Sequence, residues 1–326
     1  MYVEIIIYCI LLFLSLYFLW FAGDKSVKYS IKTAANFKLT SLFVGFALIA
    51  ISTGLPELAI VIISIFEKTH GISTGTILGS NVCDISLVLG LAVLLGGNII
   101  IKKKEAKDSL LTLLVTAVSM AIVFILGTLS WIEGLILICV YFGSIWWLWK
   151  NSTKKEIQEE KTGQKKAVKD HDSFFKTKWG ILLKLLGSIF LILVFTEFAV
   201  RFAIKLTNLL KLSIETVGAT VFAIGTSLPE ISVSLNAVKK KEYSLALGNA
   251  LGSVLEQGTL LLGLLAIGYH KAVDIKPLRS LIPFMFIPFA IIAFGIIKRK
   301  KIAKIEALLM FTIFIIFMLF QIFWIR

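Results

Sequence analysis

The chain carries one polar motif twice, 173 residues apart, and both copies lie inside apolar segments. The first copy reads TGLPE and ends at Glu57, and the second reads TSLPE and ends at Glu230. At the same offset, residues 24–91 align with residues 197–264 without a gap. A carboxylate inside a membrane costs roughly 2.5–3.5 kcal/mol on insertion scales and is a functional residue by default. The sequence therefore predicts two related halves with a polar site formed by matched carboxylates.

The hydrophobic composition places the chain in the membrane. Of its 326 residues 58% are hydrophobic, and the mean hydropathy is +0.91, which no soluble domain shows. Apolar stretches alternate with charged breaks and predict an all-α polytopic protein with about ten spans of about 20 residues. We expect these spans near residues 3–22, 39–65, 73–98, 109–127, 131–149, 180–200, 214–238, 244–268, 280–297 and 305–324.

The spans divide into two repeats of five. Residues 1–149 form the first repeat, residues 179–326 form the second, and residues 150–178 form a basic linker that is too polar to bury a core. Because five is odd, the second repeat enters the membrane in the opposite orientation, which predicts an inverted-topology repeat with broken helices at the midplane. One span more or fewer would make the repeat parallel instead.

The formal charge of +14 fits a membrane orientation better than a nucleic-acid partner. The lysines form scattered clusters in the loops after the first, third, seventh and ninth spans, and the central linker is basic as well. The positive-inside rule then predicts a multi-pass protein of the plasma membrane with both termini outside and the linker in the cytoplasm. Cys9, Cys83 and Cys139 lie in apolar spans and match no metal or disulfide spacing.

A proline precedes each motif glutamate. Pro56 and Pro229 each remove a backbone donor and leave a carbonyl free one turn earlier, near Ser52 and Gly225. Broken helices at membrane depth are tolerated where they line a cavity. With the two glutamates and the hydroxyls of Thr53, Thr226 and Ser227, these carbonyls make an all-oxygen site that suits Ca2+ and Na+. The alternative is a proline kink with a lone glutamate paired to a neighbouring helix, which the second matched copy disfavours.

A second polar element follows each motif. Ser80 and Asp84 are four residues apart and share a helix face, and Ser253 and Gln257 repeat that spacing. We expect these four side chains to face the same cavity, while the neighbouring glycines permit close helix packing. Glu256 lies about 100° around the helix from Gln257, so the cavity edge, a water-filled portal and the outer interface stay open for it.

These paired motifs resemble the α-repeats of the cation/Ca2+ exchanger superfamily, and most closely its prokaryotic and archaeal Na+/Ca2+ exchangers. The resemblance covers nearly the whole transmembrane chain. It implies that Glu57 and Glu230 are central ligands shared by Ca2+ and Na+, and that Asp84 and Gln257 flank them. It further implies hydroxyl ligands from Thr53, Thr226, Ser227, Ser80 and Ser253 and backbone carbonyl ligands from Ala50 and Ala223.

The chain departs from that family pattern at four positions. Gly54 stands where the family usually has serine, and Val254 stands where it usually has asparagine. Asp84 replaces a frequent asparagine, and Gln257 replaces a frequent aspartate. The expected site therefore keeps three carboxylates, but one of them has moved to the other repeat.

Three carboxylates in a low-dielectric cavity repel one another until cations or protons neutralise them. We therefore expect a secondary antiporter that exchanges Na+ for Ca2+ by alternating access. A Ca2+/H+ antiporter on the same fold is the alternative, and a cation channel is disfavoured because no filter-like loop is present. No nucleophile–base pair is evident, so no enzyme activity is expected. We expect no cofactor, no nucleic acid and no obligatory protein partner beyond the transported ions and the lipid bilayer.

Overall fold

The computed structural model describes residues 2–37, 39–67, 70–151, 178–209, 223–269 and 272–324, and most of these are helical. In the first half the helical elements are α1 (Tyr2–Phe37), α2 (Ser41–Val44), η1 (Gly45–Ile49), α3 (Ala50–Thr53), α4 (Leu55–Glu67), α5 (His70–Val82), η2 (Cys83–Val88), α6 (Leu89–Gly96), α7 (Lys103–Leu126) and α8 (Trp131–Asn151). In the second half they are α10 (Lys178–Leu209), α12 (Ala223–Thr226), α13 (Leu228–Lys239), α14 (Tyr243–Leu255), η4 (Glu256–Leu261), α15 (Leu262–Gly268), η5 (Lys276–Leu281), α16 (Ile282–Phe294), η6 (Gly295–Arg299) and α17 (Lys304–Trp324).

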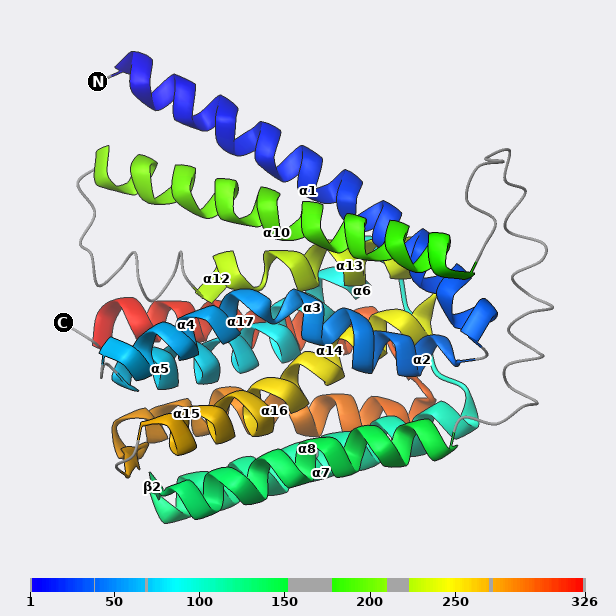
Figure 1. The fold of residues 1–326 in the computed structure, drawn as a ribbon, viewed down its shortest axis with the longest axis vertical. Helices are drawn as coiled ribbons and strands as arrows, with labels where there is room; N and C mark the ends of the chain where they lie inside the picture. Colours follow the sequence, from blue (N-terminus) through cyan, green and yellow to red (C-terminus); the bar gives the residue numbers. More distant parts are fainter. Residues whose placement is uncertain are drawn as a thin grey trace.

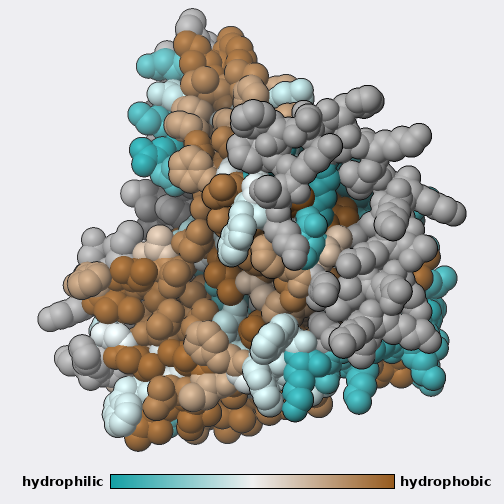
Figure 2. All heavy atoms as spheres, turned by 45° about the vertical axis from the view of Figure 1, so that its right-hand side comes forward, coloured by the Kyte–Doolittle hydropathy of each residue, from teal (hydrophilic) through white to brown (hydrophobic). Residues whose placement is uncertain are grey.

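The predicted membrane architecture is confirmed. The described residues contain eight helices long and apolar enough to span a membrane, and a bent pair, Ser41–Thr53 with Leu55–Phe66, would make nine. Hydrophobic atoms cover a broad area of the face seen in Figure 2. The span predicted at 214–238 falls partly on residues 210–222, outside the described residues. The count of ten, the inversion and the linker boundaries therefore stay predictions.

The helices that carry the motifs form the centre of the bundle. Helices α1 and α10 lie side by side along one flank, whereas α7 and α8 lie along the opposite flank (Figure 1). In the most apolar 18-residue window of each span, the buried share is 89% in Ser73–Gly96 and 83% in Tyr243–Gly268. It is only 17% in the first span. The segments after the two TxLPE motifs are thus enclosed by protein, which is where polar side chains can be tolerated.

Two short strand pairs join the halves at opposite ends of α7. Strand β1 (Ile99–Ile100) pairs with β4 (Lys301–Ile302), and β2 (Thr128–Leu129) pairs with β3 (Val273–Asp274), both antiparallel. Thr128 and Lys301 are 173 residues apart, and Ile99 and Val273 are 174 apart. Each ladder is therefore the repeat counterpart of the other. No feature of the sequence predicted these strands, because two residues are too few for a periodic pattern.

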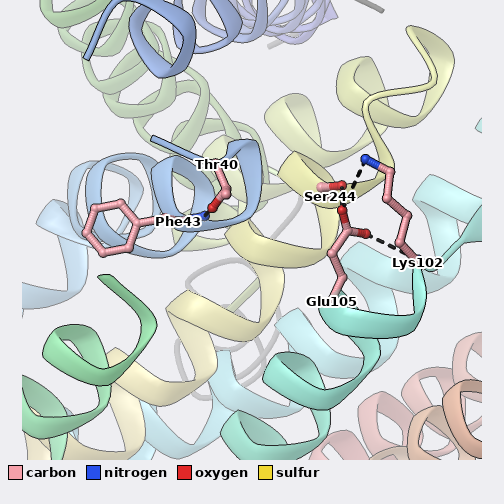
Figure 3. Close-up of polar contacts among 5 residues, drawn as sticks. All are labelled: Thr40, Phe43, Lys102, Glu105 and Ser244. Carbon is pink, nitrogen blue, oxygen red and sulfur yellow. Dashed lines mark hydrogen bonds and ion pairs between the residues drawn. The ribbon is translucent and has the colours of Figure 1, made fainter. Parts of the chain in front are cut away.

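Polar contacts fix the helix starts at one end of the bundle (Figure 3). The Thr40 hydroxyl accepts a 3.2 Å hydrogen bond from the Phe43 N–H and caps α2. Glu105, in the first turn of α7, accepts a 2.8 Å hydrogen bond from the Ser244 hydroxyl at the start of α14. The Lys102 ammonium lies 3.4 Å from the same carboxylate oxygen. One carboxylate thus ties a helix of the first half to a helix of the second.

Close backbone packing between η1 and α14 generates a first prediction. A Cβ at Gly45 would lie 2.8 Å from the Leu245 carbonyl oxygen and 2.9 Å from the Asn249 nitrogen, and neither backbone atom can yield. We expect Gly45→Ala to destabilise the protein by about 1–3 kcal/mol, as overpacking does, and to lower the apparent melting temperature in detergent. Gly143→Ala is the matched control, because a Cβ there meets nothing within 4 Å. Equal melting temperatures for the two variants would contradict the prediction.

Candidate functional site

Both TxLPE motifs break their helices as predicted. Gly54 separates α3 from α4 with φ −78° and ψ 1°, and Ser227 separates α12 from α13 with φ −86° and ψ 1°. The two breaks are 173 residues apart and share one backbone conformation. The helices on either side of Gly54 are bent by 46°. Pro56 and Pro229 lie at the second position of the following helices, where the missing N–H costs least.

Each break places a glutamate in the first turn of the helix that follows it. Glu57 and Glu230 are both completely buried. The N-terminal end of a helix carries a partial positive charge, which favours a carboxylate there. None of the four carboxylate oxygens has a hydrogen-bond partner among the described residues. The hydroxyls of Ser80 and Thr226 lie near Glu57, and the hydroxyl of Thr53 lies near Glu230.

Asp84 and Gln257 meet between the two halves. The Gln257 amide donates a 2.8 Å hydrogen bond to an Asp84 carboxylate oxygen, and the two residues are repeat counterparts, 173 positions apart. Both are completely buried. Each lies at the second position of a π-helical turn, in η2 and η4, and π-turns often mark functional sites. The sequence predicted an ordinary helix here, because no residue pattern announces a π-turn.

The predicted hydroxyl ligands are all buried, but they differ in how they are held. Ser80 and Thr226 lie 3.1 Å apart, oxygen to oxygen, across the two halves. Thr53 donates to the carbonyls of Ile49 and Ala50, both at 3.1 Å, and Ser253 donates to Asn249 at 3.1 Å.

The other predicted ligands lie at the two breaks. The Ser227 hydroxyl has no partner within the described part of the chain. The Ala50 carbonyl accepts hydrogen bonds from the Gly54 N–H and the Thr53 hydroxyl, and Ala223 is the first residue of α12. Their roles as ligands stay predictions.

The chemistry available at this site is that of hard oxygen ligands. Carboxylate, amide and hydroxyl oxygens suit Ca2+ and Na+, whereas softer metals prefer histidine and cysteine. Among the described residues, no three His, Cys, Asp or Glu side chains are close enough together to hold one metal ion. A bound cation would therefore need hydroxyl, amide or carbonyl oxygens as further ligands, or the carboxylates would have to move closer together.

Sequence reasoning left one buried carboxylate without a role. Glu256 begins η4 and is 1% exposed, and its charge lies within electrostatic range of Glu57 and Asp84. Two signals pointed to it: it neighbours Gln257, and its repeat counterpart, Cys83, adjoins Asp84. The helix-wheel argument placed it about 100° from Gln257 and left the cavity edge, a portal and the outer interface open. The structure buries it near Glu57 and Asp84.

The fold and site define a polytopic membrane protein with a buried, oxygen-lined site between two matched halves. A sequence model of the sodium/calcium exchanger protein family matches residues 7–150 and again residues 180–323. An uncharacterised membrane protein of Methanocaldococcus jannaschii is 31% identical over 284 residues, which cover 85% of this chain and 89% of that protein. The sodium/calcium exchanger MaX1 of Methanosarcina acetivorans is 25% identical, and the match covers 85% and 87% of the two chains.

A solved structure shares the fold. The sodium–calcium exchanger NCX_Mj superposes with a TM-score of 0.78 at 27% identity, covering 96% of this chain and 98% of that chain. Since the family model matches both halves, the chain belongs to the sodium/calcium exchanger protein family. The expected resemblance to cation/Ca2+ exchangers is thereby confirmed. The double match also confirms that the chain contains two related halves.

The Asp84–Gln257 contact generates a second prediction. In Gln257→Glu the donor becomes a second carboxylate beside Asp84, so we expect a loss of stability of about 1–3 kcal/mol without Ca2+. Millimolar Ca2+ should raise the apparent melting temperature more than in the unchanged protein, because it neutralises the added charge. Gln257→Leu, which removes the donor and adds no charge, is the control and should gain no extra protection from Ca2+. An equal rise in melting temperature with Ca2+ in both variants would contradict the prediction that the added charge at position 257 increases stabilisation by Ca2+.

Proposed function

We propose that this protein is a secondary antiporter that exchanges Na+ for Ca2+ across the plasma membrane, with the ions bound by the paired motif carboxylates. The main support is the matched pair Glu57 and Glu230. Both are completely buried, each follows a helix break, and their oxygens have no partner within the described residues. A buried, unpaired carboxylate is costly unless a cation accompanies it. Membership of the sodium/calcium exchanger family supports the choice of ions.

Antiport follows from competition for the same oxygens. Ca2+ and Na+ both require the carboxylates of this site, so the site binds one kind of ion at a time. If only the loaded site can switch its access, exchange is the result. Coordination would combine Glu57, Glu230, Asp84 and Gln257 with the hydroxyls of Thr53, Thr226, Ser227, Ser80 and Ser253 and the carbonyls of Ala50 and Ala223.

Helices α1 and α10 are the elements we propose to move. They contact each other along their length, and α1 also contacts α13. The connection between α1 and α13 is polar: Ser232 donates a 3.0 Å hydrogen bond to the Leu19 carbonyl, and Asn236 donates one of 3.3 Å to the Trp20 carbonyl. At the helix end, the Lys240 ammonium lies 2.7 Å from an Asp24 carboxylate oxygen. A few such bonds can be exchanged during a shift of the two helices.

The orientation is proposed from charge and from the arrangement of helix ends. Helix α1 begins and α17 ends at the same end of the bundle (Figure 1). The lysines that flank β1 and β4 lie at the end of α7 remote from β2 and β3. The positive-inside rule then places both termini outside and residues 150–178 in the cytoplasm.

Exchange of Ca2+ for H+ is the second candidate. The observation that favours it is that buried carboxylates can be neutralised by protons as well as by Na+. The transport assay below separates the two coupling ions.

Ca2+ uptake into proteoliposomes tests the proposal and forms a third prediction. Vesicles loaded with Na+ should take up Ca2+, while K+-loaded vesicles at the same fixed pH should not. Glu57→Ala and Glu230→Ala should each abolish uptake, because each removes a central ligand. Glu197→Gln is the control: its side chain is exposed and pairs with Arg201 on the same helix, so its uptake should be unchanged.

Uptake that does not depend on internal Na+ but is driven by a pH gradient would show that the coupling ion is H+ rather than Na+. A steady single-channel current in planar bilayers would contradict antiport altogether.

A further inference from the structure

Besides Asp84 and Gln257, the two half-sites differ at two matched positions that lie close together in the fold. Gly54 in the first repeat corresponds to Ser227 in the second, and Cys83 corresponds to Glu256. The backbone does not require glycine at position 54, since Ser227 adopts nearly the same φ and ψ at its own helix break. Both positions have a negative φ, which does not require glycine. What Gly54 provides is therefore space rather than conformational freedom.

Glu256 fills that space. A Cβ at Gly54 would lie 3.1 Å from each carboxylate oxygen of Glu256 and 3.2 Å from its carboxyl carbon. In the other half-site, the Ser227 side chain is near Cys83 and Asp84. In the first half-site the smallest residue, Gly54, lies against the large Glu256. In the second, Ser227 and Cys83 are both of intermediate size. Where the second helix break carries the Ser227 hydroxyl, the first break has the Glu256 carboxylate beside it.

The Glu256 carboxylate has the character of a ligand. It is 1% exposed, and its Oε2 atom has no hydrogen-bond partner in the part of the chain that the structure describes. It lies within electrostatic range of Glu57 and Asp84, so it belongs to the same charged cluster. Nearby, Tyr141 is 1% exposed and its hydroxyl has no described partner either. A buried carboxylate oxygen without a donor is costly, and a cation removes that cost.

We propose that Glu256 is a fourth carboxylate ligand of the cation site, which reaches the first helix break through the space left by Gly54. This inference rests on the proposed function, because it concerns the same cations. The missing serine hydroxyl at position 54 is then replaced by a stronger oxygen ligand from the opposite repeat. The proposed site then carries four carboxylates instead of three, so one Ca2+ neutralises half of their formal charge. The Na+-loaded site accordingly binds more positive charge than a three-carboxylate site would.

Direct Ca2+ binding to the purified protein in detergent tests this assignment, by titration calorimetry with CaCl2 alone and with NaCl as competitor. Glu256→Gln keeps the shape of the side chain and removes its charge. We expect its dissociation constant for Ca2+ to rise about tenfold or more, as the loss of a charged ligand implies, and Na+ to compete less steeply. The matched control is Glu306→Gln: Glu306 is also buried, at 4% exposure, but it pairs with Arg299 at 2.9 Å at the start of α17.

A second variant changes the space and keeps the carboxylate. Gly54→Ala forces the flexible end of Glu256 to move, so Ca2+ affinity should fall. The double variant Gly54→Ala with Glu256→Gln should be no weaker than Glu256→Gln alone, because both changes act through one group. Additive losses would overturn the proposal, as would unchanged affinity in Glu256→Gln. Absence of Ca2+ binding by the unchanged protein, or binding insensitive to Glu57→Ala, would instead refute the proposed function.

Discussion

Everything in this structure is arranged around carboxylates that are kept away from water. Glu57, Asp84, Glu230 and Glu256 are buried among helices that are themselves surrounded by apolar neighbours. Such groups destabilise a protein unless helix ends, amide donors or cations compensate them. The helix breaks supply the first kind of compensation, and Gln257 supplies the second to Asp84. The remaining carboxylate oxygens have no partner within the described residues, and the proposed cations would compensate them.

Matched sequence positions meet across the centre of the molecule. Asp84 contacts its own repeat counterpart, and Ser80 contacts Thr226, whose counterpart Thr53 directly precedes the first helix break. A site built in this way cannot exist in one half alone. The repeat also explains why the two half-sites can diverge in residue type while their backbones stay alike. The Gly54–Glu256 and Ser227–Cys83 pairs show such divergence within one conserved geometry.

Much of the fold and the centre of the site could be predicted from the sequence. The apolar stretches predicted the membrane spans, the two prolines predicted the helix breaks, and the constant offset predicted that Glu57 and Glu230 are matched residues of one site. The π-turns at Cys83 and Glu256 could not be predicted, because they depend on packing rather than on a residue signature. The proposed role of Glu256 was not predicted, because on an ideal helix its direction diverges from that of Gln257 and three positions stayed open for it. Its fit against Gly54 is a contact between distant segments, which only the folded chain displays.

The two short ladders have a consequence for how the chain assembles. Each ladder takes one strand from each repeat, since β1 pairs with β4 and β2 pairs with β3. The sequence divides into two homologous units, but the main-chain hydrogen bonds at both ends of α7 cross between them. Neither repeat can therefore complete its own backbone pairing by itself. The duplication describes the ancestry of the chain, whereas we expect the two repeats to fold together because each ladder needs a strand from both.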